Sequence, residues 1–419
     1  MVQPNLTMSD IDPIDRHSDV NCSAIYATGS RRRVSVEFLK ETGKPVLDFV
    51  NTMDRFLHMG TITFFPKLTM KLLAGLAALV SLGATAPQAP TPIDVQLQMD
   101  GNSAVKATIT NNGKDDLKIF KTGTILDKSA IQKTRITDID GKAASFEGFR
   151  QRITTKGLKD DAFERISAGQ SIEVTFNVGE VHDLSSGGKF DIHSSGVMHF
   201  ANGSDNTIIG SVPYHSNSIT ANINGSEAGA LLKSFQRAQK RAMKRTNVQS
   251  DCTGNQLSVT QTALNNCQQL ASAAQSAARS NDAKVKEYFK DSSASTKNTV
   301  ADVFGKAASE CGSTGGGVSK YYCTDISNQC NGGVLAYTYP GQSYQAYCGS
   351  YFQMTPLTSQ CHAQDQATTN LHETTHLTQI KGTTDNGYGY DNAMGLDTQK
   401  ALDNADTYAL FANAIKVNC

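Results

Sequence analysis

The sequence of 419 residues predicts an α+β protein, in which a β-rich, sandwich-like region precedes a mostly helical domain with a small β-sheet or hairpin. Apolar and polar residues alternate between about Ile93 and Asn224, whereas apolar residues recur at helical spacing after Thr246. Eight of the nine cysteines fall in that second region. Basic and acidic residues number 39 each, so the net charge gives no reason to expect nucleic acid or a membrane surface as a partner.

Residues 1–69 have no clear periodicity and form an unassigned N-terminal extension. Met70 then begins a segment with one lysine, an apolar core of about a dozen residues and a small-residue end, which is typical of a secretory signal peptide. An internal membrane anchor is the alternative, but the apolar run is shorter than the roughly 20 residues that a membrane span needs. The sequence therefore favours translation from Met70, a signal peptide at residues 70–89 and a secreted, extracellular product.

The β-rich region after the signal peptide contains no cysteine. Its period-two runs, such as residues 105–109 and 172–176, are separated by Asn-Gly, Asp-Gly and Ser-Gly-Gly turns. Alternation that is interrupted by such turns predicts a small antiparallel β-sandwich.

A basic stretch at residues 231–245 ends in Lys244-Arg245. A basic helix is usually a solvated face and sometimes a nucleic-acid patch. Here it separates cysteine-free from cysteine-rich sequence in a secreted chain, which favours a dibasic processing site. We therefore expect a propeptide at residues 90–245, released by a dibasic-processing protease, and a mature domain at residues 246–419.

The mature domain is predicted to be helical around one β element. Tyrosine-rich strands between Tyr321 and Phe352 flank a Tyr339-Pro340-Gly341 turn and predict a hairpin or small sheet. Helical segments are expected at residues 259–274, 300–307, 361–381 and 397–417.

The cysteines indicate an oxidising compartment. Cys22 stands alone near the start, while the other eight form an even set behind a secretory segment, as in a disulfide framework. A second metal site is the alternative, but the sequence has no C-x-x-C pair. Eight cysteines permit about 105 connectivities, so the sequence alone does not assign the pairs.

The chemistry is concentrated in the segment Leu371–Tyr390. His372 and His376 stand four residues apart, and a helix places both imidazoles on one face, where they can bind one metal ion. Glu373 can direct its carboxylate at the remaining coordination position, where a water would bind. This H-E-x-x-H arrangement is typical of metalloproteases, although the same motif also occurs on helices with ordinary surface histidines.

A catalytic zinc usually takes three protein ligands, so a third is needed. No histidine follows His376 and no glutamate follows Glu373, which leaves aspartates as the strong downstream candidates. Asp385 is best placed, because Gly382 would end the helix in a left-handed cap and the next turn would bring the chain back. The other downstream oxygen candidates are Asp391, Asp397, Asp403, Asp406, Tyr388 and Tyr390.

The pattern His372-Glu373-x-x-His376 followed by Gly382-Thr383-x-Asp385-x-x-Tyr388-Gly389 resembles the deuterolysin, or aspzincin, family of fungal secreted zinc endopeptidases. The resemblance implies a zincin-type mature domain with one Zn²⁺ on His372, His376 and Asp385, and it implies a propeptide. It also implies three disulfides, Cys252–Cys323, Cys330–Cys348 and Cys361–Cys419. The two cysteines that remain, Cys267 and Cys311, would form a fourth, which looks like an addition to the family's usual set.

On this reading, Glu373 is the general base, which takes a proton from the zinc-activated water and passes it to the leaving amine. Tyr388 is the candidate donor to the tetrahedral oxyanion. An ordinary packed tyrosine is the alternative for Tyr388, and Tyr351 is a rival for the same role.

Asp406 lies in N-A-D-T-Y-A-L-F, which also resembles a family motif. Three roles are considered in order of preference: orienting a zinc-bound histidine, lining the substrate pocket, or replacing Asp385 as the third ligand. A helix-surface aspartate is the remaining alternative. His362 and Asp365 are expected on the same helix as the histidine ligands, as structural residues.

These observations predict a secreted, monomeric zinc endopeptidase that acts on protein or peptide substrates and contacts its own propeptide before maturation. Its mature domain contains 14 acidic and 10 basic residues, which favours cationic substrates through weak steering, in agreement with the family's reputation for basic proteins. A secreted zinc-binding interaction or virulence protein without catalysis is the alternative, against which the intact Glu373 argues. A serine hydrolase has less support, because G-x-S-x-G does not occur.

Overall fold

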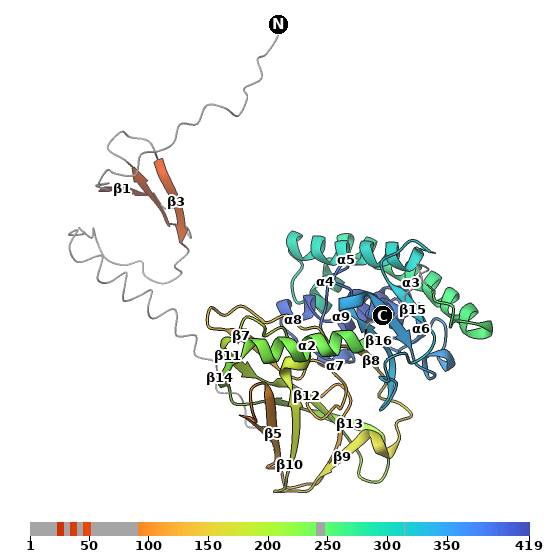
Figure 1. The fold of residues 1–419 in the computed structure, drawn as a ribbon. Helices are drawn as coiled ribbons and strands as arrows, with labels where there is room; N and C mark the ends of the chain where they lie inside the picture. The colour runs from red at the N-terminus through yellow and green to blue at the C-terminus, as the bar shows by residue number, and fades with distance from the viewer. Residues whose placement is uncertain (1–22, 29–33, 40–44, 52–90, 240–247, 314) are drawn as a thin grey trace. The chain divides into compact units, whose positions relative to one another are not determined.

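The computed structural model describes residues 23–28, 34–39, 45–51, 91–239, 248–313 and 315–419 (Figure 1). The predicted signal peptide at residues 70–89, Cys22 and the processing site at Lys244 and Arg245 lie outside the described residues. The chain divides into two compact units, Met1–Gln88 and Ala89–Cys419. Helices and strands both contribute to the second unit, which confirms the α+β class.

The first unit contains an antiparallel sheet in the order β1-β2-β3. Its strands are β1 (Ser23–Thr28), β2 (Val34–Leu39) and β3 (Pro45–Asn51). No element was predicted here, because residues 1–69 lack a clear hydrophobic period.

The N-terminal part of the second unit is a set of three sheets, ordered β10-β5-β4, β14-β11-β7 and β13-β12-β6-β9. Strand β5 shows the physical basis of the period-two pattern, because Val105, Ala107 and Ile109 are buried while the residues between them are half-buried. The sheets enclose a common hydrophobic core. The elements are β4 (Ile93–Met99), β5 (Ala104–Asn111), β6 (Leu117–Phe120), β7 (Arg135–Asp138), β8 (Arg150–Ile153), β9 (Phe163–Ile166), β10 (Ser171–Asn177), β11 (Gly188–His193), β12 (Ser195–Ala201), β13 (Ile208–His215), β14 (Ile219–Ile223) and the 3₁₀ turns Asp160–Ala162 and Val178–Glu180.

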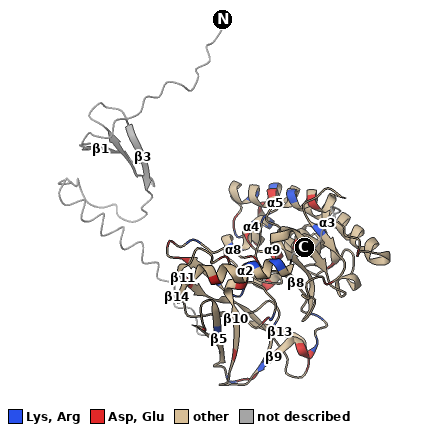
Figure 2. Cartoon of the chain, viewed as in Figure 1, with Lys and Arg blue, Asp and Glu red and all other residues tan. Residues whose placement is uncertain are grey.

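Helix α2 (Gly225–Gln239) follows the last of these strands. Leu232 and Phe235 are buried on one side of it. Basic and acidic residues both occur along its length, as they do along α5 (Ala294–Gly312) (Figure 2). Such a helix, apolar on one side and charged on the other, is typical of the surface of a globular domain.

The C-terminal part is mostly helical around a small sheet. Helices α3, α5, α6 and α9 pack together, and their core includes the stacked rings of Phe304 and Phe411, 5.5 Å apart. The remaining elements are α3 (Gly254–Ser280), α4 (Asp282–Phe289), β15 (Lys320–Tyr322), β16 (Val334–Tyr339), β17 (Tyr344–Tyr347), α6 (Gln366–Thr375), α7 (Tyr390–Met394), α8 (Thr398–Leu402), α9 (Ala405–Val417) and the 3₁₀ turns Pro340–Gln342 and Tyr351–Gln353.

One sheet joins the two parts of this unit. Its order is β15-β17-β16-β8, so that β8 from the β-rich part lies antiparallel to β16 of the helical part. Phe149, next to β8, contacts Tyr337 and Tyr339 of β16, with ring centroids 5.5 and 5.2 Å apart. The segments predicted to be propeptide and mature domain therefore share a hydrophobic core in the uncleaved chain.

Helix α6 begins later than predicted. Asp365 is its N-cap and forms a capping box with Thr368, which fixes the start of the helix. His362 precedes this cap, with a left-handed backbone at φ 56°. The expectation that both residues lie within the helix is therefore wrong.

The same helix also ends earlier than predicted. It stops at Thr375, with His376 as its C-cap. The Thr375 hydroxyl donates to the His372 carbonyl at 2.8 Å, which competes with the next backbone hydrogen bond of the helix. Turns follow as far as Gly382, whose φ of 72° suits glycine.

The predicted final helix at residues 397–417 is divided into α8 and α9. Between them, the backbone N–H of Thr384 donates to the Asp403 carbonyl at 2.8 Å, and Thr384 forms a parallel bridge with Asn404. This tertiary contact interrupts a segment whose apolar spacing is continuous in the sequence.

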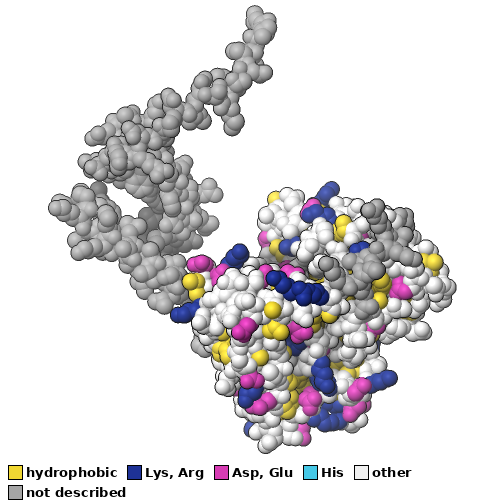
Figure 3. Space-filling view, in the orientation of Figure 1, with side chains coloured by type: hydrophobic (Ala, Val, Ile, Leu, Met, Phe, Trp, Pro, Cys, Tyr) yellow, Lys and Arg dark blue, Asp and Glu magenta, His cyan; other side chains and the backbone are white. Residues whose placement is uncertain are grey.

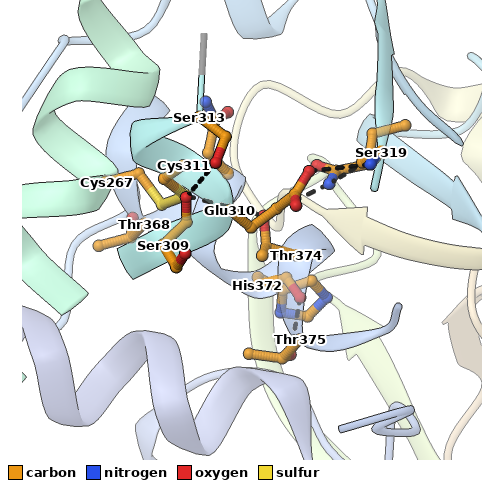
Figure 4. The surroundings of a disulfide bond; sticks show 12 residues. Cys267, Ser309, Glu310, Cys311, Ser313, Ser319, Thr368, His372, Thr374 and Thr375 are labelled. Atoms are coloured by element: carbon orange, nitrogen blue, oxygen red, sulfur yellow. Dashed lines mark hydrogen bonds between the residues drawn. A yellow bond between two sulfur atoms is a disulfide. The ribbon is translucent and has the colours of Figure 1, made fainter. Parts of the chain in front are cut away.

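Disulfides crosslink the helical part. They are Cys252–Cys323, Cys267–Cys311, Cys330–Cys348 and Cys361–Cys419. The second joins α3 to α5, and Cys311 Sγ lies 3.8 Å from Thr374 Oγ1 of α6. Figure 4 shows Thr374 and His372 near this disulfide, so α6 rests against a crosslinked pair of helices. Within the described ranges, no helix has the length and apolar character to cross a membrane.

Candidate metal centre

Helix α6 brings His372 and His376 together with Asp385. Nε2 of His372 lies 3.2 Å from Oδ1 of Asp385, and Nε2 of His376 lies 3.4 Å from the same oxygen. Both histidine side chains are fully buried, whereas Asp385 is 14% exposed. The three candidate ligand atoms lie within 4.8 Å of one another, a spacing that one metal ion can bridge.

The turn after α6 delivers Asp385 to this position. At Gly382 the backbone N–H groups of residues 382 and 383 both donate to the Thr375 carbonyl, which closes the end of the helix. Thr384 is then held by its bridge to Asn404, so the chain runs back past the histidines and Asp385 follows directly.

The second ring nitrogen of each histidine has its own contact. Nδ1 of His376 lies 2.9 Å from the Thr383 carbonyl, a contact that assigns the proton to Nδ1. Nδ1 of His372 lies 3.4 Å from Oδ1 of Asp406. Nδ1 of His372 also lies 3.2 Å from Nη1 of Arg152, whose guanidinium can only donate. These contacts therefore assign the proton to Nδ1 for His376 alone, whose Nε2 lone pair remains available on the side of Asp385.

The unpaired atoms at this site suit a metal ion. Nε2 of His372, Nε2 of His376, Oδ1 of Asp385 and Oε1 of Glu373 are buried, and none has a hydrogen-bond partner among the described residues. Buried polar atoms are normally paired, so four orphans at one point need an explanation. Two imidazole nitrogens and one carboxylate oxygen form a common ligand set for catalytic zinc, and the residues present therefore fit that ion.

Burial and charge pairing set the ionisation of the candidate ligands. Although burial alone would raise it, His376 and His372 hold the pKa of Asp385 well below its usual value. Burial lowers the pKa of His372 to about 3, so this ring is neutral near pH 7. Burial would also lower the pKa of His376, but Asp385 outweighs it and raises that pKa. An ionised carboxylate and a neutral imidazole are the forms that bind a divalent cation.

Glu373 lies beside the ligands with its carboxylate buried. Oγ1 of Thr338, on β16, donates to Oε2 of Glu373 at 2.6 Å and to its backbone carbonyl at 3.0 Å. Burial raises the pKa of Glu373 to about 7. A carboxyl group with a pKa near 7 can both accept and return a proton near neutral pH.

The structure brings Tyr388 to the centre and places Tyr351 elsewhere. The Tyr388 ring stacks near His372, with centroids 6.1 Å apart, and its hydroxyl donates to the Gln151 carbonyl at 2.8 Å. Burial raises the pKa of Tyr388 well above its usual value, so the hydroxyl remains a donor. The buried Tyr351 hydroxyl instead donates to Oδ1 of Asn370 at 2.8 Å.

Asp406, in the first turn of α9, lies behind His372. Its Oδ2 accepts a hydrogen bond from the Gly389 N–H at 2.5 Å, and its Oδ1 pairs with the Arg152 guanidinium. The side chains of Asp406 and Arg152 are each 2% exposed, which rules out a helix-surface aspartate. Asp406 thus contacts both a histidine of the centre and a basic side chain.

The two other residues of interest lie outside the centre. Asp365 caps α6, and Nε2 of His362 is 2.6 Å from the Tyr288 hydroxyl.

Several residues that do contact the centre or its surroundings belong to no sequence motif and were not predicted: Gln151, Arg152, Thr338 and Gln364. They are single polar residues in strands or loops, and only the folded chain brings them to their partners.

Known proteins resemble this chain over most of its length. The model of the "Deuterolysin metalloprotease (M35) family" matches residues 64–419. A "Neutral protease 2 homolog" of Phaeosphaeria nodorum is 46% identical over 358 residues, which cover 85% of this chain and 99% of that protein. One from Colletotrichum graminicola is 46% identical over 353 residues, covering 84% and 98%. The solved structure of a zinc peptidase from Grifola frondosa is 22% identical, with a TM-score of 0.33 over 39% of this chain and 97% of that one.

Proposed function

Because the chain belongs to the deuterolysin metalloprotease (M35) family, we propose that it is a secreted zinc endopeptidase that hydrolyses peptide bonds within proteins. The observation that carries this proposal is the convergence of His372, His376 and Asp385 beside Glu373, with an unpaired buried atom on each. The intact Glu373 favours catalysis over a zinc-binding protein without activity.

His372, His376 and Asp385 would hold one Zn²⁺, with Asp406 behind His372. Bound zinc would lower the pKa of a water molecule toward 7 and polarise the substrate carbonyl. Oε1 of Glu373, the oxygen without a hydrogen bond, takes the proton of the attacking water and delivers it to the leaving amine. Thr338 fixes the carboxylate for this transfer through Oε2.

Tyr388 would donate a hydrogen bond to the oxyanion that forms at the substrate carbonyl. Its hydroxyl already donates to a backbone carbonyl, that of Gln151, beside the ligands. A donor aimed at developing negative charge stabilises the transition state more than the ground state. Tyr351 has no part in this role, because its hydroxyl is bonded to Asn370.

A preference for basic substrates follows from Asp406. Its carboxylate pairs with the guanidinium of Arg152 in a site where both side chains are almost fully buried. A buried carboxylate needs a cationic partner, so a lysine or arginine side chain of a substrate would be bound there more strongly than an apolar one. On the face drawn in Figure 3, basic and acidic side chains are intermixed, so this face shows no patch of one sign.

The chain would reach this state by processing. A signal peptide at residues 70–89 would direct secretion, and cleavage after Lys244-Arg245 would release the propeptide at residues 90–245 from the monomeric catalytic domain at residues 246–419. Protein substrates would then occupy the site that the uncleaved chain covers.

Metal analysis, N-terminal sequencing and a casein-cleavage assay on the secreted protein test this proposal. We expect about one zinc per chain, an N-terminus at Thr246 and cleavage that 1,10-phenanthroline abolishes and added Zn²⁺ restores. Activity in a metal-free protein would refute the mechanism, and another N-terminus would refute the processing site.

A further inference from the structure

Strand β8 lies along the edge of β16 that borders the metal centre. The pairs Arg152–Ala336, Gln151–Tyr337 and Arg150–Thr338 set its antiparallel register. Thr338 is the residue that holds Glu373, so β8 pairs with the strand segment next to the general base. A peptide in this position is held through its backbone, whatever its sequence.

The peptide group between Gln151 and Arg152 faces the centre. The Gln151 carbonyl accepts a hydrogen bond from the Tyr388 hydroxyl at 2.8 Å, and the Gln151 N–H lies 3.4 Å from Oδ2 of Asp385. Gln151 is 1% exposed and Arg152 is 2% exposed. Gln151 thus presents its carbonyl to the group that is proposed to bind the substrate carbonyl.

The residues after this peptide group are held as well. The Arg152 guanidinium fills the position beside Asp406. Nε2 of Gln364 donates to the Ile153 carbonyl at 2.7 Å. The Thr154 N–H donates to the Gly333 carbonyl at 2.8 Å, beyond the end of β8. A cavity of about 730 Å³ borders this side and is lined by Arg152, Gln364 and Asp406 among others.

We propose that Arg150–Ile153 is a pseudosubstrate strand that occupies the substrate groove of the uncleaved chain. The Gln151–Arg152 peptide bond then stands where the scissile bond of a substrate stands, and Arg152 takes the place of the residue after that bond. Gln364 is, on this geometry, a residue that binds the backbone of the second residue on the leaving-group side. The inference rests on the proposed function, because it reads β8 as an occupant of a protease groove.

This arrangement would keep the uncleaved chain inactive. His372, Glu373 and His376 have no exposed surface while β8 is in place, so a protein substrate has no path to them. Because β8 is part of the same chain, its effective concentration at the groove far exceeds that of an external substrate. Cleavage after Arg245 removes this advantage, since β8 can then dissociate with the rest of the propeptide.

The experiment uses the full chain with Lys244→Ala and Arg245→Ala, so that it stays uncleaved. Into this parent we introduce Arg152→Ala, with Arg165→Ala as the control, because Arg165 is an exposed arginine of the same region that pairs only with Asp160 among the ion pairs described. Hydrogen exchange of the β16 amides, the rate of zinc removal by a chelator and cleavage of a short fluorogenic peptide are measured.

We expect Arg152→Ala to accelerate β16 exchange and zinc removal at least tenfold and to raise peptide cleavage, while Arg165→Ala matches the parent. Unchanged exchange in β16 and unchanged zinc removal would overturn the inference. If exchange and zinc removal accelerate but neither the uncleaved variant nor the processed enzyme cleaves any peptide, the proposed function fails while the placement of β8 stands.

Gln364→Ala in the processed enzyme gives a second, independent test. Two peptide substrates are compared. The longer one has two residues after the scissile bond, and the shorter one has a single residue there that ends as an amide. The ratio of kcat/KM for the longer to the shorter substrate should fall about threefold to tenfold, as for one lost hydrogen bond. An unchanged ratio would show that Gln364 does not bind substrate in the groove.

Discussion

Oγ1 of Thr338 donates a 2.6 Å hydrogen bond to Oε2 of Glu373, and this contact joins strand β16 to helix α6 across 35 positions of sequence. It leaves Oε1 as the free oxygen of the proposed general base. Strand β16 and helix α6 therefore orient the carboxylate together, and substitutions of Thr338 and Glu373 test the two contributions separately.

Glu373→Gln should keep the metal and lose activity. The amide retains the shape of the side chain but has no basic oxygen for the proton of the attacking water, so kcat should fall by about 10² to 10⁴-fold. Zinc content and casein cleavage are measured together on the processed enzyme. Glu287→Gln, on α4, is the matched control and should leave both unchanged; a fully active Glu373→Gln enzyme would end the general-base assignment.

Thr338→Val should lower kcat with little change in zinc content. Valine keeps the volume but removes the donor to Oε2, so the carboxylate loses its fixed orientation, and a loss of about tenfold is expected for one such hydrogen bond. Thr299→Val, a half-buried threonine of α5, is the control. If kcat stays at the parent value while KM rises, Thr338 acts on substrate binding instead.

Asp385→Ala should abolish zinc binding, whereas Asp406→Ala should weaken it about 10 to 100-fold, because a residue behind a ligand tunes the metal rather than holding it. Equilibrium dialysis with zinc separates the two. If Asp385→Ala still binds zinc and Asp406→Ala does not, Asp406 is the third ligand and Asp385 is the residue that supports the site.

Tyr388→Phe should reduce kcat by about 10² or more at nearly constant KM, as expected for the loss of an oxyanion donor. Tyr351→Phe removes the bond to Asn370 and should instead cost about 1 kcal/mol of stability without a change in kcat. Steady-state kinetics and thermal unfolding distinguish these outcomes, and the reverse pattern would give the role to Tyr351.

The uncleaved chain should lose stability in acid through His182. Burial, with a smaller effect of Arg150, lowers the pKa of this histidine to about 3 in the folded chain, against about 6.5 when unfolded. The unfolded chain therefore binds more protons between these values, so the free energy of unfolding decreases as the pH falls from about 6.5 toward 3.

Calorimetry of the full chain at pH 7 and pH 5 measures this effect as a change in Tm. His182→Gln should show a smaller fall in Tm than the parent, whereas the control His215→Gln, at an exposed position of β13, should show the same fall as the parent. Identical falls in all three proteins would exclude His182 as the acid-sensitive group.

Local chemistry was sufficient to predict that His372, His376 and Asp385 lie together. The four-residue spacing places His372 and His376 on one face, and Gly382 allows the left-handed turn that returns Asp385 to them. The boundaries of α6 were predicted too wide, because the Asp365 capping box and the Thr375 hydroxyl act more locally than the hydrophobic period does. The break before α9 was missed, because it depends on Thr384 pairing with Asn404.

The sequence by itself determined the family, the histidine pair with its glutamate and the α+β class, since these depend on residues within about one helical turn or on periods along one strand. The tertiary structure decided which residues surround them. Thr338 meets Glu373, Asp406 lies behind His372, and Arg152 reaches His372 across 220 positions of sequence. No local pattern encodes such contacts, because strand pairing brings β8 to β16 through backbone hydrogen bonds that any sequence can make.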